Sequence, residues 1–341
     1  MSLPSSGGNS GCGTLVANSG KGGYYRVRYD APAHAAIVRD FARLPLADQL
    51  GTLGDDMALG YSGDQDLARW FETFGAVGTD ADPLVWTMLV GQTNRLVTLY
   101  EHTPLGERVK ARATAQFAPL LDRIGLEPRA GDGPLVVNLR EALVGFLGEA
   151  GDARVTDAAR RYVTALARDP AAIPTGIRSP ILDTYAARAT GADWDALLAM
   201  TRAERSPVVR ASYLTLLGHA EDPALAQRAL ALVKGEEFTA PQRASLLAAI
   251  ARVHPALAFD FATANAATVN GLLETSSRSS FIVNLAMASN DPAMIGKVRD
   301  WAAKNLPEGS RGPAERTASA IANRIAFADR LRPAVTAWAG K

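Results

Sequence analysis

The chain has 341 residues, enough for one large domain or two modest ones. Its 36 Lys and Arg residues nearly balance its 35 Asp and Glu residues, so charge gives no reason to expect nucleic acid or an anionic membrane as a partner. No apolar run approaches the roughly 18 residues that a membrane-crossing helix needs. We therefore expect a soluble, folded protein, cytoplasmic or periplasmic depending on the N-terminal segment of the natural protein.

The first thirteen residues are rich in glycine and serine and lack the basic and apolar regions of a signal peptide. We interpret residues 1–13 as an appended leader or a linker. Cys12, the single cysteine of the chain, lies in this segment and cannot form an internal disulfide.

Residues 14–30 contain the only convincing strand pattern. Two β-prone runs, 14–16 and 23–29, flank the turn-forming cluster Asn18–Gly22. The pattern predicts a β-hairpin. An isolated hairpin is marginally stable in water, so we expect it to pack on the following helices or to be the remnant of a sheet domain that precedes this region.

From residue 31 to residue 341 the pattern is helical. Apolar residues recur at helical spacing, and an aspartate stands before a proline at Asp82, Asp169, Asp222 and Asp291. An aspartate can accept hydrogen bonds at a helix N-cap, and proline tolerates the first helical position. Each pair therefore predicts the start of a helix.

Three Pro-Ala helix starts, at Pro223, Pro255 and Pro292, lie 32 and 37 residues apart. That spacing is typical of one helix-turn-helix unit in an α-solenoid. The expected fold is all-α, a superhelix of paired helices resembling HEAT or armadillo repeats, with the short hairpin at its N-terminus.

Residues with catalytic or metal-binding patterns are scarce. None of the four histidines begins an H-E-x-x-H helix, and no G-x-S-x-G elbow is present. His219 with Glu221 and Asp222 comes nearest to a ligand cluster, but adjacent side chains at a helix end point apart. We assign no catalytic residue and no metal ligand.

Asp55 and Asp56 form a paired carboxylate on a predicted helix. Neighbours on a helix do not share a face, so we interpret the pair as a polar face or as ion-pair partners for Arg26 or Arg28.

The polar loop Glu274–Ser280 precedes a helix that begins near Phe281. Its N–H groups and Arg278 could receive a carboxylate, which makes Arg278 the one candidate substrate-binding residue. The alternative is that the serines only cap the helix.

Four segments resemble a known family. The run Gly23–Asp30 resembles the "GYYRVNYD" segment of the M1 family zinc aminopeptidases, which include aminopeptidase N and the puromycin-sensitive and endoplasmic-reticulum enzymes. Asp55–Gly63 is similar to the family's "DDAFALARAG", and Val85–Trp86 stands where the family has "PVW" or "VPW". Residues 316–338 resemble the terminal helix, so the likeness extends over nearly the whole chain.

The resemblance implies the C-terminal helical domain of an M1 aminopeptidase. In that family the segment at 14–30 closes a β-sandwich domain, and the helical domain caps the zinc site and encloses the peptide cavity. The implied partners are the catalytic and β-sandwich domains of the parent chain, and peptide substrates. The zinc-binding H-E-x-x-H and the G-A-M-E-N motif are absent from this sequence, so we expect no cofactor here, one zinc ion in the parent, and no aminopeptidase activity of this region alone.

A second interpretation stays open. A free-standing α-solenoid could bind another protein along one face of its helix array. An exposed hairpin edge argues against it, because such an edge invites association.

Overall fold

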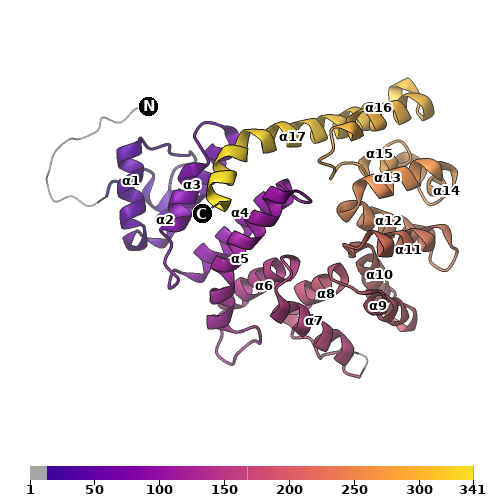
Figure 1. Ribbon diagram of the computed structural model, residues 1–341, viewed down its shortest axis with the longest axis horizontal. Helices are drawn as coiled ribbons and strands as arrows, with labels where there is room; N and C mark the ends of the chain where they lie inside the picture. Colours follow the sequence, from indigo (N-terminus) through magenta and orange to yellow (C-terminus); the bar gives the residue numbers. More distant parts are fainter. Residues whose placement is uncertain (1–13, 167, 341) are drawn as a thin grey trace. The chain divides into compact units, whose positions relative to one another are not determined.

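The computed structural model describes residues 14–166 and 168–340, and these contain seventeen α-helices and no β-strand (Figure 1). The expected all-α fold is confirmed. The proposed leader and Cys12 lie outside the described residues. The helices are α1 (Ala31–Asp40), α2 (Leu46–Ser62), α3 (Ala68–Gly75), α4 (Pro83–Leu99), α5 (Pro104–Ile124), α6 (Pro134–Glu149), α7 (Ala153–Leu166), α8 (Arg178–Ala187), α9 (Gly191–Ala203), α10 (Pro207–Leu216), α11 (Pro223–Lys234), α12 (Ala240–Val253), α13 (Pro255–Ala264), α14 (Ala266–Gly271), α15 (Phe281–Asn284), α16 (Ala293–Asn305) and α17 (Gly312–Ala339).

The chain divides into two compact units, and the dividing points fall within α4 and α17. The first unit takes in the described residues up to Leu96 together with those from Arg330 onward. The second unit is Val97–Asp329. Each unit is described by itself below.

The second unit is an array of paired helices. Helices α6, α8, α10 and α12 contact one another in sequence and form one layer. Helices α7, α9 and α11 each pack against the even-numbered helix that follows, and Figure 1 shows these three pairs in succession. This is the two-layer arrangement that the repeat spacing predicts.

Three of the four Asp-Pro pairs begin helices as expected. Asp222 accepts a hydrogen bond from the Ala224 N–H at 2.8 Å at the start of α11, and Asp82 and Asp291 make equivalent bonds. The prediction of a helix start is wrong at Asp169: its carboxylate accepts the equivalent Ala171 N–H at 2.9 Å, but its carbonyl oxygen accepts the Ala172 N–H at 3.0 Å and the bonds close only a turn. Residues 168–174 are therefore not helical, and the next helical turn is the 3-10 turn that begins at Thr175.

Charged side chains join successive repeats of the second unit. Arg202 binds Glu237 through two nitrogens at 2.7 and 2.8 Å, and Arg228 pairs with Asp195. The partners in such pairs lie 32 to 37 residues apart, which is the repeat spacing of the sequence. Similar positions in neighbouring repeats therefore meet across each interface.

The first unit is organised around aromatic side chains. Trp70, Phe71 and Phe74 of α3 are buried, and Trp338 near the end of α17 stacks on Phe71 with 4.8 Å between ring centroids. Trp338 also stacks on Phe74 at 5.9 Å, and Trp86 meets Phe74 edge-on at 6.2 Å. The last turns of α17 are thus part of this core.

The predicted β-hairpin at residues 14–30 is wrong. This segment contains one 3-10 turn, η1 (Ser19–Lys21), and no strand is assigned within it. Its two arms meet through side chains: the Asn18 side chain bonds the backbone of Gly23 and Tyr25, and the Tyr29 hydroxyl bonds the backbone N–H of Ala17 at 3.0 Å. These bonds use backbone groups that a strand ladder would need.

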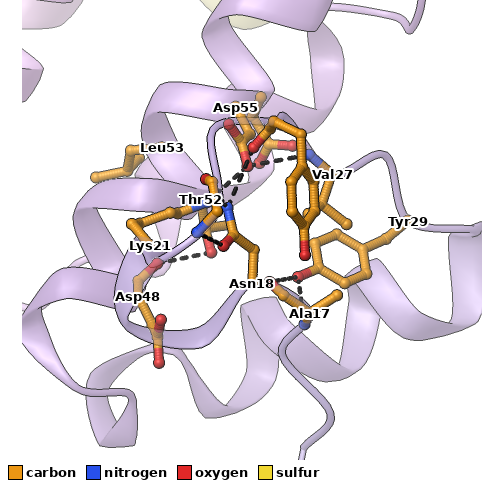
Figure 2. Close-up of polar contacts among 12 residues, drawn as sticks. Ala17, Asn18, Lys21, Val27, Tyr29, Asp48, Thr52, Leu53 and Asp55 are labelled. Carbon is orange, nitrogen blue, oxygen red and sulfur yellow. Dashed lines mark hydrogen bonds and ion pairs between the residues drawn. The ribbon is translucent and has the colours of Figure 1, made fainter.

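Carboxylates of α2 bind this segment and hold it against that helix within the first unit (Figure 2). Asp48 accepts bonds from the Gly20 N–H at 2.7 Å and from the Ser19 hydroxyl at 2.8 Å. Asp55 binds the Lys21 ammonium at 2.7 Å and the Val27 N–H at 3.2 Å. The segment therefore runs along α2. The backbone N–H groups of Gly20 and Val27 donate to aspartate side chains and not to a neighbouring strand.

Asp55 and Asp56 point to different partners, as expected for helix neighbours, but neither pairs with Arg26 or Arg28. Asp55 binds Lys21 instead. Asp56 is 2% exposed and accepts bonds from the Thr73 hydroxyl at 2.7 Å and the His34 Nε2 at 3.1 Å. Asp56 is thus a buried polar connection between α1, α2 and α3, whereas Asp55 holds the N-terminal segment against α2.

A buried arginine fixes the connection between α5 and α6. Arg140 is 1% exposed, and its guanidinium donates to the carbonyl oxygens of Ile124 and Gly125 at 3.0 and 2.8 Å. It also binds Asp132 at 2.6 Å. The cation thus satisfies unpaired carbonyls at the C-terminus of α5, where the helix dipole favours positive charge.

Candidate functional site

A pocket of about 460 Å³ lies within the second unit, where the end of α12, the loop before α15, α15 itself and α17 meet. Its lining residues are Ala248, Ala251, Arg252, Ser277, Ser280, Phe281, Asn284, Leu285, Met287, Ala288 and Arg324. Most of the lining is apolar, and two guanidinium groups supply its positive charge. Such a pocket suits a small apolar group that carries a carboxylate.

The two arginines come from helices far apart in the sequence. Arg252 stands in the last turn of α12, where a cation is favoured by the helix dipole, and its Nη2 contacts the Nε2 of His219. Arg324 belongs to α17 and donates an N–H to the Ala288 carbonyl oxygen at 3.2 Å. Each guanidinium is tied on one side by a protein acceptor.

The loop chosen from the sequence contributes to this pocket. Ser277 and Ser280 line it, whereas Arg278 does not. Arg278 is exposed, and its Nε donates to the Leu273 carbonyl oxygen at 3.4 Å. Ser280 stands at the N-cap of α15 without a side-chain cap bond, because its hydroxyl donates to the Ser277 carbonyl oxygen at 3.2 Å.

Sequence reasoning missed Arg252 and Arg324. Neither residue stands in a recognisable motif, and arginine near a helix end ordinarily indicates only a favourable dipole interaction. The available signal was the repeat spacing, since Arg252 and His219 lie 33 residues apart. Repeat spacing alone predicts that they are neighbours, although it does not predict a pocket.

Three glutamates gather elsewhere in the second unit: Glu101 follows α4, Glu149 is the last residue of α6, and Glu221 follows the 3-10 turn η4 (Leu217–His219). Burial raises the pKa of Glu149, and the negative charges of Glu101 and Glu221 raise it further. Burial likewise raises the pKa of Glu101, while neighbouring cations oppose the rise. Glu221 is paired with Arg188 at 2.9 Å. Lys110, Arg188 and Arg324 lie close enough to oppose these shifts, so the glutamates are part of a mixed cluster of both charges.

The residues weighed as metal ligands have other partners. The Nδ1 of His219 faces Asp183 at 3.4 Å, Glu221 pairs with Arg188, and Asp222 caps α11. Within residues 14–166 and 168–340, no three His, Cys, Asp or Glu side chains gather so as to hold a metal ion.

Over the described part of the chain, no helix combines the length and the apolar character needed to cross a bilayer.

The helical architecture and the motifs within it match a known family. A family model described as the ERAP1-like C-terminal domain covers residues 14–323. The chain belongs to this family. The resemblance to the C-terminal domain of M1 aminopeptidases is therefore confirmed, and it extends from residue 14 to residue 323 rather than over the short motifs alone.

Individual relatives point the same way. The chain is 25% identical over 238 residues to Aminopeptidase M1 of Arabidopsis thaliana, a match that covers 67% of this chain and 27% of the relative. It is 27% identical over 153 residues to Aminopeptidase M1-A of Oryza sativa subsp. japonica, covering 43% and 17%. It is 24% identical over 156 residues to Tricorn protease-interacting factor F2 of Thermoplasma acidophilum, covering 46% and 19%. The chain thus spans about a quarter or less of the length of these relatives.

Proposed function

We propose that this domain is the lid of a zinc aminopeptidase that releases N-terminal residues from peptides. The observation that carries the proposal is the family match over residues 14–323. Two of the relatives are named aminopeptidases, and the chain corresponds to only 27% and 17% of their lengths. The remaining length of such a protein has room for a catalytic domain and a β-sandwich domain, the proposed partners.

A lid of this kind acts by enclosure. Closing it over a zinc site excludes bulk solvent, apart from the water molecule that hydrolysis consumes, and favours substrates that fit the enclosed space. The paired helices supply a rigid wall, because each pair is packed and ion-paired to the next. The catalytic chemistry belongs to the zinc-bearing domain, which the resemblance places outside this helical domain.

Within this lid, the pocket between α12, α15 and α17 is our proposed contact for the peptide. Arg252 and Arg324 offer donors for a carboxylate, and Phe281 and Leu285 offer an apolar surface beside them. Arg278 is exposed next to the lining residue Ser277, so it is in place to contact a peptide that extends over the loop.

The argument against the scaffold interpretation was an exposed strand edge at residues 14–30. These residues form no strand, so that argument no longer applies. No feature of the described residues favours it over the family match. We therefore retain the lid as the proposed function.

Two measurements test the lid. The gene upstream of Thr14 should encode an in-frame H-E-x-x-H helix with a glutamate about twenty residues beyond it. The 341-residue chain by itself should show no zinc-dependent release of an aminoacyl fluorophore. A stop codon upstream would refute the parent enzyme, and saturable hydrolysis by the chain alone would refute a purely non-catalytic role.

A third measurement tests the pocket. A fluorescein-labelled peptide ending in leucine should bind the chain more tightly as the free acid than as the amide. Arg324→Ala should reduce this preference, and Arg278→Ala should weaken both peptides to a smaller extent. Arg202→Ala is the matched control, because Arg202 is an exposed, ion-paired arginine in the last turn of α9 and does not line the pocket. Equal binding of acid and amide would refute the carboxylate site.

A further inference from the structure

Two side chains, His219 and Asp183, lie in line behind the pocket residue Arg252. Arg252, in the last turn of α12, contacts His219 of η4 through its Nη2. The opposite ring nitrogen of His219, Nδ1, lies 3.4 Å from the Oδ1 of Asp183 on α8. The His219 side chain is 14% exposed, while that of Asp183 is 52% exposed. The imidazole is therefore held between the two partners in a mostly covered position.

Hydrogen-bonding chemistry assigns the protons in this line. A guanidinium has only donors, so the Nε2 of His219 must accept from Arg252 and carries no proton there. A neutral imidazole then has its proton on Nδ1, which faces a carboxylate that can only accept. Arg252 thus donates to His219, and the Nδ1–H of His219 faces the Asp183 carboxylate as an ion-pair contact at 3.4 Å.

Neighbouring polar groups do not compete for the imidazole. The nearby His254 directs its own Nε2 to the Ala220 carbonyl oxygen at 2.9 Å. Glu221, two residues beyond His219, pairs with Arg188 at 2.9 Å. The Asp183–His219 pair is thus available to serve Arg252.

We propose that His219, oriented by Asp183, is a positioning residue that holds the Arg252 guanidinium at the pocket for a ligand carboxylate. This inference rests on the proposed binding role of the pocket. A long arginine side chain that is already held in place loses less conformational freedom when a ligand binds. The remaining guanidinium donors can then meet the two oxygens of a carboxylate.

The first test reads the tautomer of His219 directly. In the chain labelled with ¹⁵N-histidine, long-range ¹H–¹⁵N spectra should show His219 in the Nδ1–H form, with its signals assigned by their loss in His219→Gln. Arg252→Ala should shift the population towards the Nε2–H form, which a merely space-filling histidine would not do. An Nε2–H tautomer in the unaltered chain would overturn the inference, whatever the pocket binds.

The second test separates positioning from bulk. His219→Ala should weaken binding of the leucine-ending peptide acid about fivefold to tenfold and leave the amide unchanged. His219→Gln should restore most of the affinity, since a glutamine oxygen can accept from Arg252 as Nε2 does. Arg202→Ala again serves as the control.

The outcomes distinguish the two proposals. Equal loss of affinity in the alanine and glutamine variants would overturn positioning while leaving the pocket intact. No preference for the acid in the unaltered chain would refute the pocket, and the tautomer measurement would still decide the state of His219. Thermal unfolding of both variants shows whether a loss of binding is a loss of folding.

Discussion

Removing Trp338 should weaken the first unit far more than its position near the chain end suggests. The side chain is 6% exposed and stacks on Phe71 and Phe74 at 4.8 and 5.9 Å. An aromatic side chain buries about 150–250 Å², which at roughly 25 cal/mol per Å² corresponds to about 4–6 kcal/mol. Measured costs of truncating a buried aromatic residue are about 3–5 kcal/mol. We expect Trp338→Ala to lower the free energy of unfolding of the first unit by about 4 kcal/mol.

The assay is urea unfolding followed by far-UV circular dichroism, with hydrogen exchange to locate the loss. Protection should fall in α2 and α3 and remain in α7 to α12, because these groups of helices belong to different units. Trp301→Ala is the control, since Trp301 of α16 is only partly buried. A loss in Trp338→Ala no greater than that in Trp301→Ala, or a loss of protection centred on α7 to α12, would refute the reasoning.

Three further predictions concern buried charges. Arg140→Ala should cost about 3–5 kcal/mol in urea unfolding, because it removes the cation from Asp132 and from the end of α5. Asp55→Ala should cost about 1–3 kcal/mol and make residues 17–29 more sensitive to protease, because it removes the partner of Lys21. Glu149→Gln should raise the melting temperature at pH 7, because burial and Glu101 raise the pKa of Glu149 and so disfavour its charged form in the folded state.

The sign of the pH effect follows from proton binding. With a pKa raised above 4.5 on folding, Glu149 holds more protons in the folded state than in the unfolded state, so its ionisation costs stability as the pH rises. The gain from Glu149→Gln should therefore shrink as the pH falls towards 4.5 and below. Exposed residues of the same type provide the controls: Glu141→Gln on α6 for the pH series, Arg129→Ala for Arg140, and Asp80→Ala for Asp55. A gain from Glu149→Gln that grows at acid pH would contradict the assignment.

The sequence predicts the helical array well because its signals are local. Asp222 and Pro223 specify a helix start through a hydrogen bond two residues away, and the apolar period specifies the buried face. The hairpin failed because the partners of its backbone groups are distant: Asp48 and Asp55 lie about 28 residues away along the chain from Gly20 and Val27. Strand propensity describes what a segment prefers when no such partner competes.

In the candidate site, too, the sequence predicts features that depend on local signals and misses those that depend on distant partners. The polar loop was recognised as unusual, and its serines do line the pocket. Arg252 and Arg324 were not recognised, because their meeting depends on α12 and α17 converging near α15. A repeat spacing can place His219 beside Arg252, but the imidazole's proton position follows only from knowing both of its neighbours.

The ion pairs between repeats also limit how this array can evolve. Asp195 meets Arg228 in the next repeat, so a tandem copy of α9 and α10 would place one copy of Asp195 against the other. Two like charges at that interface would repel, whereas an array of identical neutral repeats could lengthen freely. The ion pairs between repeats therefore favour one order of the helix pairs along the array.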